Sequence, residues 1–136
     1  MDSLALTREL EKLWSENPLG RDHNLYRTRG MPFARDVMRV AARHFRLPVD
    51  YLIADRRSVD IVYARHVAMY MAYRMTNNST PMIGRVFGGR DHTTVLHAVK
   101  KIERFLQEER PRTVADVEEI KRGVLAIREA APCQTE

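Results

Sequence analysis

The residues best suited to chemistry form one contiguous run, Gly-Gly-Arg-Asp-His-Thr-Thr, at positions 88–94. Within it, Arg90 can bind a phosphate or guanine, and Asp91 can accept a hydrogen bond from the N4 amine of cytosine. The methyl groups of Thr93 and Thr94 can lie against thymine methyls. The two glycines allow the backbone to approach another molecule closely. The chemistry of this run therefore suits contacts with the edges of DNA bases.

Three consecutive helices with short joints are expected to position this run, at residues 63–76, 81–87 and 92–105. Thr80 is the expected N-cap of the second helix, with Pro81 at its first helical position. A glycine pair ends the second helix, and Asp91 is the expected N-cap of the third. The layout is that of a helix-turn-helix, in which the first residues of the third helix lie against base edges in the major groove.

The rest of the chain also has helical periodicity. Apolar residues recur every three or four positions in segments 3–14, 34–45 and 114–131, and a short helix fits 49–53. The methionines Met69, Met71, Met75 and Met82 are expected to fill the core. We find no alternating strand pattern and no internal repeat. The sequence thus predicts an all-α helix-turn-helix bundle at 33–131, with an N-terminal helical extension and loop at 1–32 and a tail at 132–136.

The positive charge of the chain is concentrated in one region. The 136 residues carry a net charge of +5, and residues 54–104 hold nine basic and four acidic side chains, which accounts for the whole surplus. A localised basic excess indicates a polyanionic partner. One cysteine offers no internal disulfide, and we expect neither a secretory leader nor a membrane span. These features predict a cytoplasmic, nucleoid-associated protein.

Catalysis, metal binding and nucleotide binding are not expected. His92 and His97 are five positions apart on one helix, so they do not share a face as a metal pair would. Asp91 beside His92 could suggest general-base chemistry, but no serine or cysteine nucleophile lies in a matching context. No glycine precedes a lysine, so a phosphate-binding loop of the GKS/GKT type is absent. We therefore predict a protein that is not an enzyme and has no cofactor.

Residues 87–98, Phe-Gly-Gly-Arg-Asp-His-Thr-Thr-Val-Leu-His-Ala, followed by Lys101 and Ile102, resemble the signature of the C-terminal DNA-binding domain of DnaA, the bacterial chromosomal replication initiator. The similarity extends upstream through Ala68, Pro81 and the dipeptide 83–84 (Ile-Gly), and covers roughly residues 33–130. It implies a bundle similar to that of the Trp repressor.

The resemblance also implies roles for individual residues. In that family the recognition helix reads the major groove of an asymmetric nine-base-pair box similar to TTATCCACA. By resemblance, the contacts in that groove are made by Arg90, Asp91, His92, Thr93 and Thr94. Pro81 would pack near thymine methyls, and Arg57 would enter the adjacent minor groove, whose negative potential favours arginine. Arg65, Lys100 and Lys101 would hold phosphates or flank the site.

The chain departs from the family pattern in the basic loop. Where the family usually has Lys, Arg and an Ala-Arg-Pro-Arg stretch, this chain has Asp55, Val59 and Val-Tyr-Ala-Arg at 62–65. Thr80 stands where a leucine is common. Weaker phosphate anchoring and altered specificity on the minor-groove side are therefore expected, whereas the major-groove residues are intact.

Two functional hypotheses follow. The first is a stand-alone protein that binds DnaA-box-like sites in double-stranded DNA, without an ATPase, and regulates transcription or modulates replication initiation by occupying them. The alternative is a protein-interaction module that binds the replication or transcription machinery and binds DNA only weakly. The apolar face of residues 3–14 either packs on its own domain or mediates a dimer or a protein partner.

Overall fold

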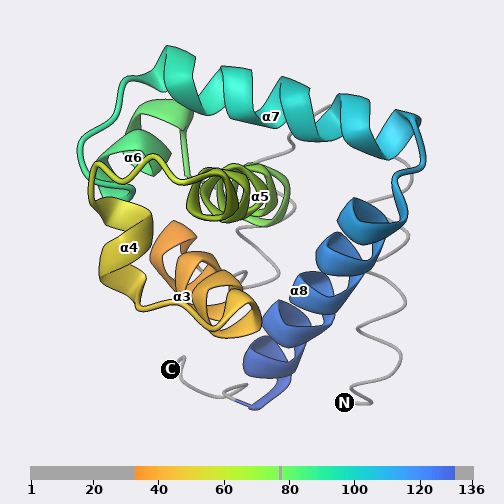
Figure 1. The fold of residues 1–136 in the computed structure, drawn as a ribbon. Helices are drawn as coiled ribbons and strands as arrows, with labels where there is room; N and C mark the ends of the chain where they lie inside the picture. The colour runs from red at the N-terminus through yellow and green to blue at the C-terminus, as the bar shows by residue number, and fades with distance from the viewer. Residues whose placement is uncertain (1–32, 77, 131–136) are drawn as a thin grey trace.

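The computed structural model describes residues 33–76 and 78–130 (Figure 1). Within these residues it contains helices and no strand. The helices are α3 (Ala34–Phe45), α4 (Val49–Ile53), α5 (Val59–Met75), α6 (Thr80–Val86), α7 (His92–Gln107) and α8 (Pro111–Ala130). The predicted all-α fold is confirmed. The predicted helix at 3–14 and the tail at 132–136 lie outside the described residues.

Helix α5 forms the centre of the bundle. Figure 1 views it end-on, with α7 crossing above it, α3 below it and α8 to one side. Most of its side chains are buried, including Val67, Met69 and Met71, none of which is exposed to solvent. A helix enclosed by neighbours on all sides must be apolar all round, and the run from Val67 to Ala72 meets this condition.

The helix boundaries differ from the predicted ones by a few residues. Helix α6 begins at Thr80, and its N-cap is Ser79, whose Oγ accepts a hydrogen bond from the backbone N–H of Met82. The predicted cap at Thr80 is therefore wrong by one position, and Pro81 lies in the first turn. Met82 is also 39% exposed, so the expectation that it fills the core is wrong, whereas the other three methionines predicted there are buried.

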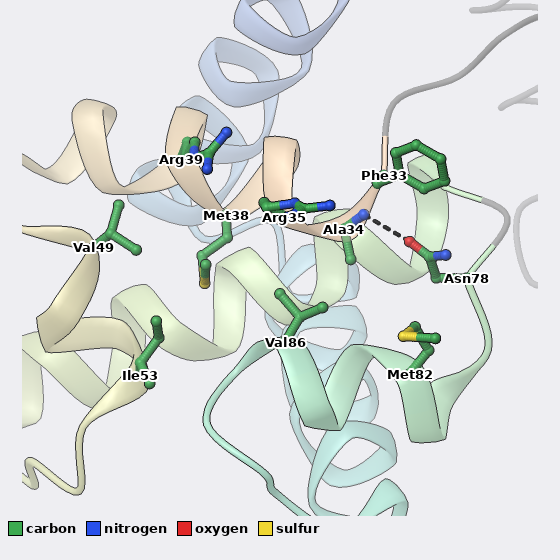
Figure 2. Close-up of a pocket in the computed structure, with 10 residues that line it drawn as sticks. All are labelled: Phe33, Ala34, Arg35, Met38, Arg39, Val49, Ile53, Asn78, Met82 and Val86. Atoms are coloured by element: carbon green, nitrogen blue, oxygen red, sulfur yellow. Dashed lines mark hydrogen bonds between the residues drawn. The ribbon is translucent and has the colours of Figure 1, made fainter.

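The joint between α5 and α6 is tied to the start of α3. The side-chain oxygen of Asn78 accepts a 2.7 Å hydrogen bond from the backbone N–H of Ala34 (Figure 2). This N–H belongs to the first turn of α3, where it has no partner within the helix. The bond therefore satisfies an otherwise free donor and fixes α6 relative to the core.

Candidate nucleic-acid interface

The turn between α6 and α7 depends on glycines for close backbone approach. The N–H of Arg90 donates to the carbonyl oxygen of Gly84 at 2.8 Å, and a Cβ atom on Gly84 would lie 2.1 Å from the carbonyl oxygen of Arg90. Gly88 has φ +93°, and a Cβ there would lie 2.3 Å from the carbonyl oxygen of Ile53. The turn therefore packs directly against the C-terminal end of α4.

The first turn of α7 presents polar side chains to solvent. His92, Thr93 and Thr94 are exposed, whereas Val95, at the start of the buried face of the same helix, is fully buried. The buried face holds α7 on the core, because Ala98, Val99 and Ile102 continue it. The side chains predicted to read bases are therefore exposed on a rigid element.

Asp91 lies at the N-cap position of α7, but its side chain forms no capping hydrogen bond. Its carboxylate instead accepts a 2.7 Å hydrogen bond from the Thr93 hydroxyl and pairs with His92 Nδ1 at 3.1 Å. The hydrogen bond from Thr93 is the largest cause that lowers the pKa of Asp91. The expected capping hydrogen bond to the Asp91 side chain is thus absent.

Arg65 lies in the interior, beside the loop that follows α4. Its side chain is buried, 7% exposed, and its Nε donates to the carbonyl oxygen of Leu52 at 3.1 Å. Its Nη2 donates to the carbonyl oxygens of Ala54 at 3.0 Å and Arg56 at 2.9 Å. Burial lowers the pKa of Arg65, and the nearby Arg90 guanidinium adds to this effect. The guanidinium therefore holds the loop after α4, a position that corresponds to the expectation that Arg65 flanks the site rather than to a phosphate contact.

Arg90 is also directed inward, from the opposite side of the same loop. Its Nη1 donates to the carbonyl oxygens of Ile53, at 3.0 Å, and Phe87, and its Nη2 donates to that of Ala54 at 2.9 Å. Desolvation by burial lowers the pKa of this guanidinium as well. In this structure Arg90 joins the turn before α7 to the loop after α4, a role for which the sequence pattern alone offered no signal.

The remaining predicted residues lie on the surface. Arg57 is 85% exposed in the loop before α5, with its Nε 3.6 Å from a carboxylate oxygen of Asp55. Pro81 is exposed in the first turn of α6, and Lys100 and Lys101 are exposed on α7. Arg57 and Lys101 line one common hollow, so the structure brings the minor-groove candidate and a phosphate candidate together.

Two basic residues that the sequence reading overlooked line the same hollow. Arg110 and Arg112 lie at the corner between α7 and α8, a segment interpreted from the sequence only as a joint. In the sequence, the signal for these residues was a pair of arginines on either side of Pro111. That pattern does not show which way the joint between the two helices turns. Helix α8 packs beside α5 and α7, and this corner lines the same hollow as the start of α5.

Metal binding and membrane insertion are two alternatives that the described residues can be checked for. Over 33–76 and 78–130, no group of three or more His, Cys, Asp or Glu side chains could hold a metal ion. No helix in this part of the chain is long and apolar enough to cross a membrane.

Comparison with known proteins identifies one family. Residues 34–102 match the family model described as bacterial dnaA protein helix-turn-helix. Proteins named chromosomal replication initiator protein DnaA are similar to half or more of this chain. The one from Brucella abortus is 56% identical over 68 residues, which are 50% of this chain and 14% of that protein. The one from Xanthobacter autotrophicus is 45% identical over 90 residues, or 66% of this chain and 18% of that protein.

A relative from Rhodopseudomonas palustris is 48% identical over 88 residues, which are 64% of this chain and 18% of that protein. The chain therefore spans less than a fifth of the length of these relatives. Residues 34–102, which match the family model, contain the turn between α6 and α7 and the exposed first turn of α7.

Proposed function

The chain belongs to the family of bacterial DnaA helix-turn-helix proteins, and from this premise we propose that it binds double-stranded DNA sequence-specifically at sites resembling the DnaA box. One observation carries the proposal. The polar first turn of α7 is exposed on a helix whose opposite face is buried, directly after a glycine turn. A helix held in this way can enter the major groove without first becoming ordered.

The exposed residues divide between two grooves. His92, Thr93 and Thr94, with the carboxylate of Asp91, contact base edges in the major groove. Arg57 reaches into the adjacent minor groove, since it is exposed at the end of a loop that Arg65 holds.

Further residues contact the DNA beside the major-groove and minor-groove contacts. Pro81 lies near thymine methyls, and Lys100 and Lys101 hold phosphates. Arg65 and Arg90 contribute by fixing the loop and the turn relative to each other.

We propose that the protein acts by occupying DnaA-box-like sites in DNA. The 136 residues contain no glycine followed by lysine and thus no phosphate-binding loop of the GKS/GKT type. This stretch therefore contributes DNA recognition rather than nucleotide hydrolysis. By occupying box-like sites it regulates transcription or modulates replication initiation.

Fluorescence anisotropy with two duplexes tests the proposal. One duplex contains TTATCCACA and the other a scrambled version, both at one salt concentration near 150 mM. We expect a preference of about a hundredfold or more for the box, because specific sites are bound typically 10³–10⁷ times more tightly than non-specific DNA and the altered loop weakens this ratio. Equal binding to both duplexes would contradict sequence-specific recognition of this box.

A further inference from the structure

A basic hollow lies beside the proposed DNA contacts, between the start of α5, the end of α7 and the start of α8. Its volume is about 410 Å³. Four cationic side chains line it, Arg57, Lys101, Arg110 and Arg112, together with the carboxylate of Asp60. Three of these cations also pair with carboxylates beside the hollow: Arg57 with Asp55 at 3.6 Å, Arg110 with Glu108 at 2.8 Å and Arg112 with Asp116 at 3.7 Å. Each guanidinium has five N–H donors, so one carboxylate partner leaves donors that can bind an anion entering the hollow.

Aromatic rings hold two of these cations in place. The guanidinium carbon of Arg112 lies 4.5 Å from the ring centroid of Tyr63, and that of Arg110 lies 3.9 Å from the ring centroid of Phe105. Stacking on an aromatic face restricts a guanidinium without using all of its N–H donors. Arg110 and Arg112 are therefore partly ordered before any ligand binds.

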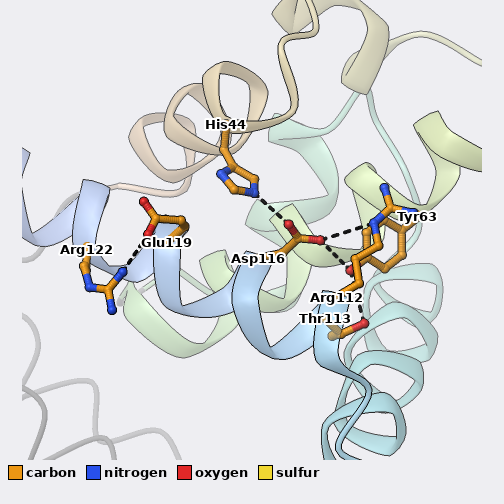
Figure 3. Close-up of polar contacts among 7 residues, drawn as sticks. All are labelled: His44, Tyr63, Arg112, Thr113, Asp116, Glu119 and Arg122. Carbon is orange, nitrogen blue, oxygen red and sulfur yellow. Dashed lines mark hydrogen bonds and ion pairs between the residues drawn. The ribbon is translucent and has the colours of Figure 1, made fainter.

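The Tyr63 ring is itself fixed by hydrogen bonds, as Figure 3 shows. Its hydroxyl donates to Asp116 at 2.7 Å, and the same carboxyl group contacts His44 Nε2 at 2.8 Å and Arg112 Nε at 3.7 Å. Burial is the main cause that raises the pKa of Tyr63 to about 12, so the hydroxyl stays protonated at neutral pH. Tyr63 is thus a neutral and rigid support for Arg112.

We propose that this hollow binds a phosphodiester group of the DNA strand that flanks the minor-groove contact. Arg110 lies just before α8 and Arg112 lies in its first turn. Together they supply positive charge that the loop before α5 lacks. At positions 55, 59 and 63 this chain has Asp, Val and Tyr, where the resemblance led us to expect basic or rigid residues. This inference rests on the proposed function, because it concerns the same complex.

The test compares three glutamine variants of the full chain. Arg110→Gln and Arg112→Gln each remove one cation from the hollow. Arg122→Gln is the matched control, because Arg122 lies on the same helix as Arg112, has similar exposure and also pairs with a carboxylate, that of Glu119. It lies ten residues, or about 15 Å, further along α8, and it does not line the hollow.

The measured quantity is the slope of log Kd against log salt for the box duplex. Each lost phosphate contact lowers this slope by about 0.9. We expect that reduction for Arg110→Gln and Arg112→Gln, with the preference for the box over the scrambled duplex unchanged, and no change for Arg122→Gln. Equal slopes for all three variants would overturn the phosphate site. Failure of the proposed function has a different signature, since the unmodified chain would then show no preference for the box.

A second hollow lies on another side of the bundle and is mainly apolar. It has a volume of about 590 Å³, between α3, α4 and α6 (Figure 2). Met38, Val49 and Val86 are among its apolar lining residues, and Phe33, Ile53 and Met82 add apolar surface that is partly exposed. Arg35 and Arg39 complete the lining from α3. Such an exposed apolar surface favours occupation by another apolar group.

From a separate set of observations, we infer that residues 6–14 of the same chain occupy this apolar hollow. Leu6, Leu10, Leu13 and Trp14 share one face at helical spacing. On that helical spacing Glu9 lies beside this face, opposite in charge to Arg35 and Arg39. Eighteen residues separate Trp14 from Phe33, which itself lines the hollow. At up to about 3.3 Å per residue, they are long enough for the segment to reach the hollow. A tether of this length keeps the segment at a local concentration of about millimolar.

Trp14 is the single tryptophan of the chain, so its fluorescence reports directly on this contact. We expect the Trp14 emission of the full chain to be blue-shifted and shielded from iodide, independently of protein concentration. Met82→Asp places a charge at the hollow and should restore red-shifted, quenchable emission. Val114→Asp is the control, because Val114 is equally exposed, 40% against 39% for Met82, but lies outside the hollow.

Three outcomes would contradict the intramolecular contact. The first is a Trp14 that is fully accessible to iodide, the second is an equal effect of Met82→Asp and Val114→Asp, and the third is shielding that depends on protein concentration. The last result would indicate that the hollow takes this segment from a second copy.

Discussion

Arg65 and Arg90 donate hydrogen bonds to the same acceptor, the carbonyl oxygen of Ala54, at 3.0 Å and 2.9 Å. Arg65 comes from α5 and Arg90 from the turn before α7, so a single carbonyl at the end of α4 joins three parts of the molecule. The two guanidiniums repel each other, but each has further carbonyl acceptors that compensate for burial.

Removing the Arg65 side chain should destabilise the fold. Arg65→Ala loses charged hydrogen bonds to buried carbonyl oxygens, so we expect the free energy of unfolding to fall by about 2 kcal/mol. Urea denaturation followed by circular dichroism measures this. Arg65→Lys should recover only part of the loss, because an ammonium group cannot reproduce the fork of a guanidinium. Unchanged stability with a lower salt slope of DNA binding would instead show that Arg65 reaches a phosphate.

Truncating the exposed first turn of α7 should reduce specificity and leave the fold intact. For His92→Ala and Thr93→Ala, we expect the preference for the box duplex to fall by about 1–3 kcal/mol each, with the salt slope retained. Anisotropy titrations with box and scrambled duplexes measure both quantities. Gln107→Ala, at the exposed opposite end of the same helix, is the control and should bind normally. A uniform loss on both duplexes would mean that these side chains bind only the backbone.

The two glycines of the turn should respond differently to alanine. Both have positive φ, +93° at Gly88 and +79° at Gly89, so each substitution is strained by about 1–2 kcal/mol. At Gly88 the new methyl group would also collide with the carbonyl oxygen of Ile53, whereas nothing lies within 4 Å at Gly89. Gly88→Ala should therefore lower the thermal midpoint more than Gly89→Ala. Equal midpoints would show that the turn can move away from α4.

His66 should make stability depend on pH. Its pKa is lowered from 6.5 to about 4, first by burial and then by Lys101, Arg65 and Arg90. Between these two values the unfolded chain binds a proton that the folded chain does not, so stability rises as pH increases from about 4 to 6.5 and then levels off. Allowing for solvent screening, the gain is about 1–2 kcal/mol.

The pH effect is isolated by comparison with His66→Gln. Urea unfolding of both proteins at several pH values should give a difference in unfolding free energy that changes over this interval and is constant above it. A constant difference at every pH would mean that the imidazole of His66 titrates normally in the folded protein.

The helices were largely predictable because their signals are local. Apolar spacing located α3, α5 and α7, and capping and turn residues located their ends to within a few positions. The exposure of the first turn of α7 also followed from its own sequence, because polar residues precede the buried stripe.

The roles of the arginines were not predictable in this way. Arg65 and Arg57 are both basic residues near one loop, and only tertiary packing buries the first and exposes the second. Likewise, nothing local to Arg112 shows that its guanidinium lies over Tyr63, forty-nine positions earlier. Long-range pairings of this kind depend on how helices cross, which periodicity does not specify.

The shared acceptor at Ala54 has a geometric consequence for the proposed complex. The turn that precedes α7 and the loop that carries Arg57 are bonded to one atom, so the distance between major-groove and minor-groove contacts is set by the protein. One base pair inserted between those contacts would move one of them by about 3.4 Å and rotate it by about 35° around the duplex axis. The protein would then discriminate sites by helical phase. It would bind poorly to a site that has the correct bases but the wrong spacing between the two grooves' contacts.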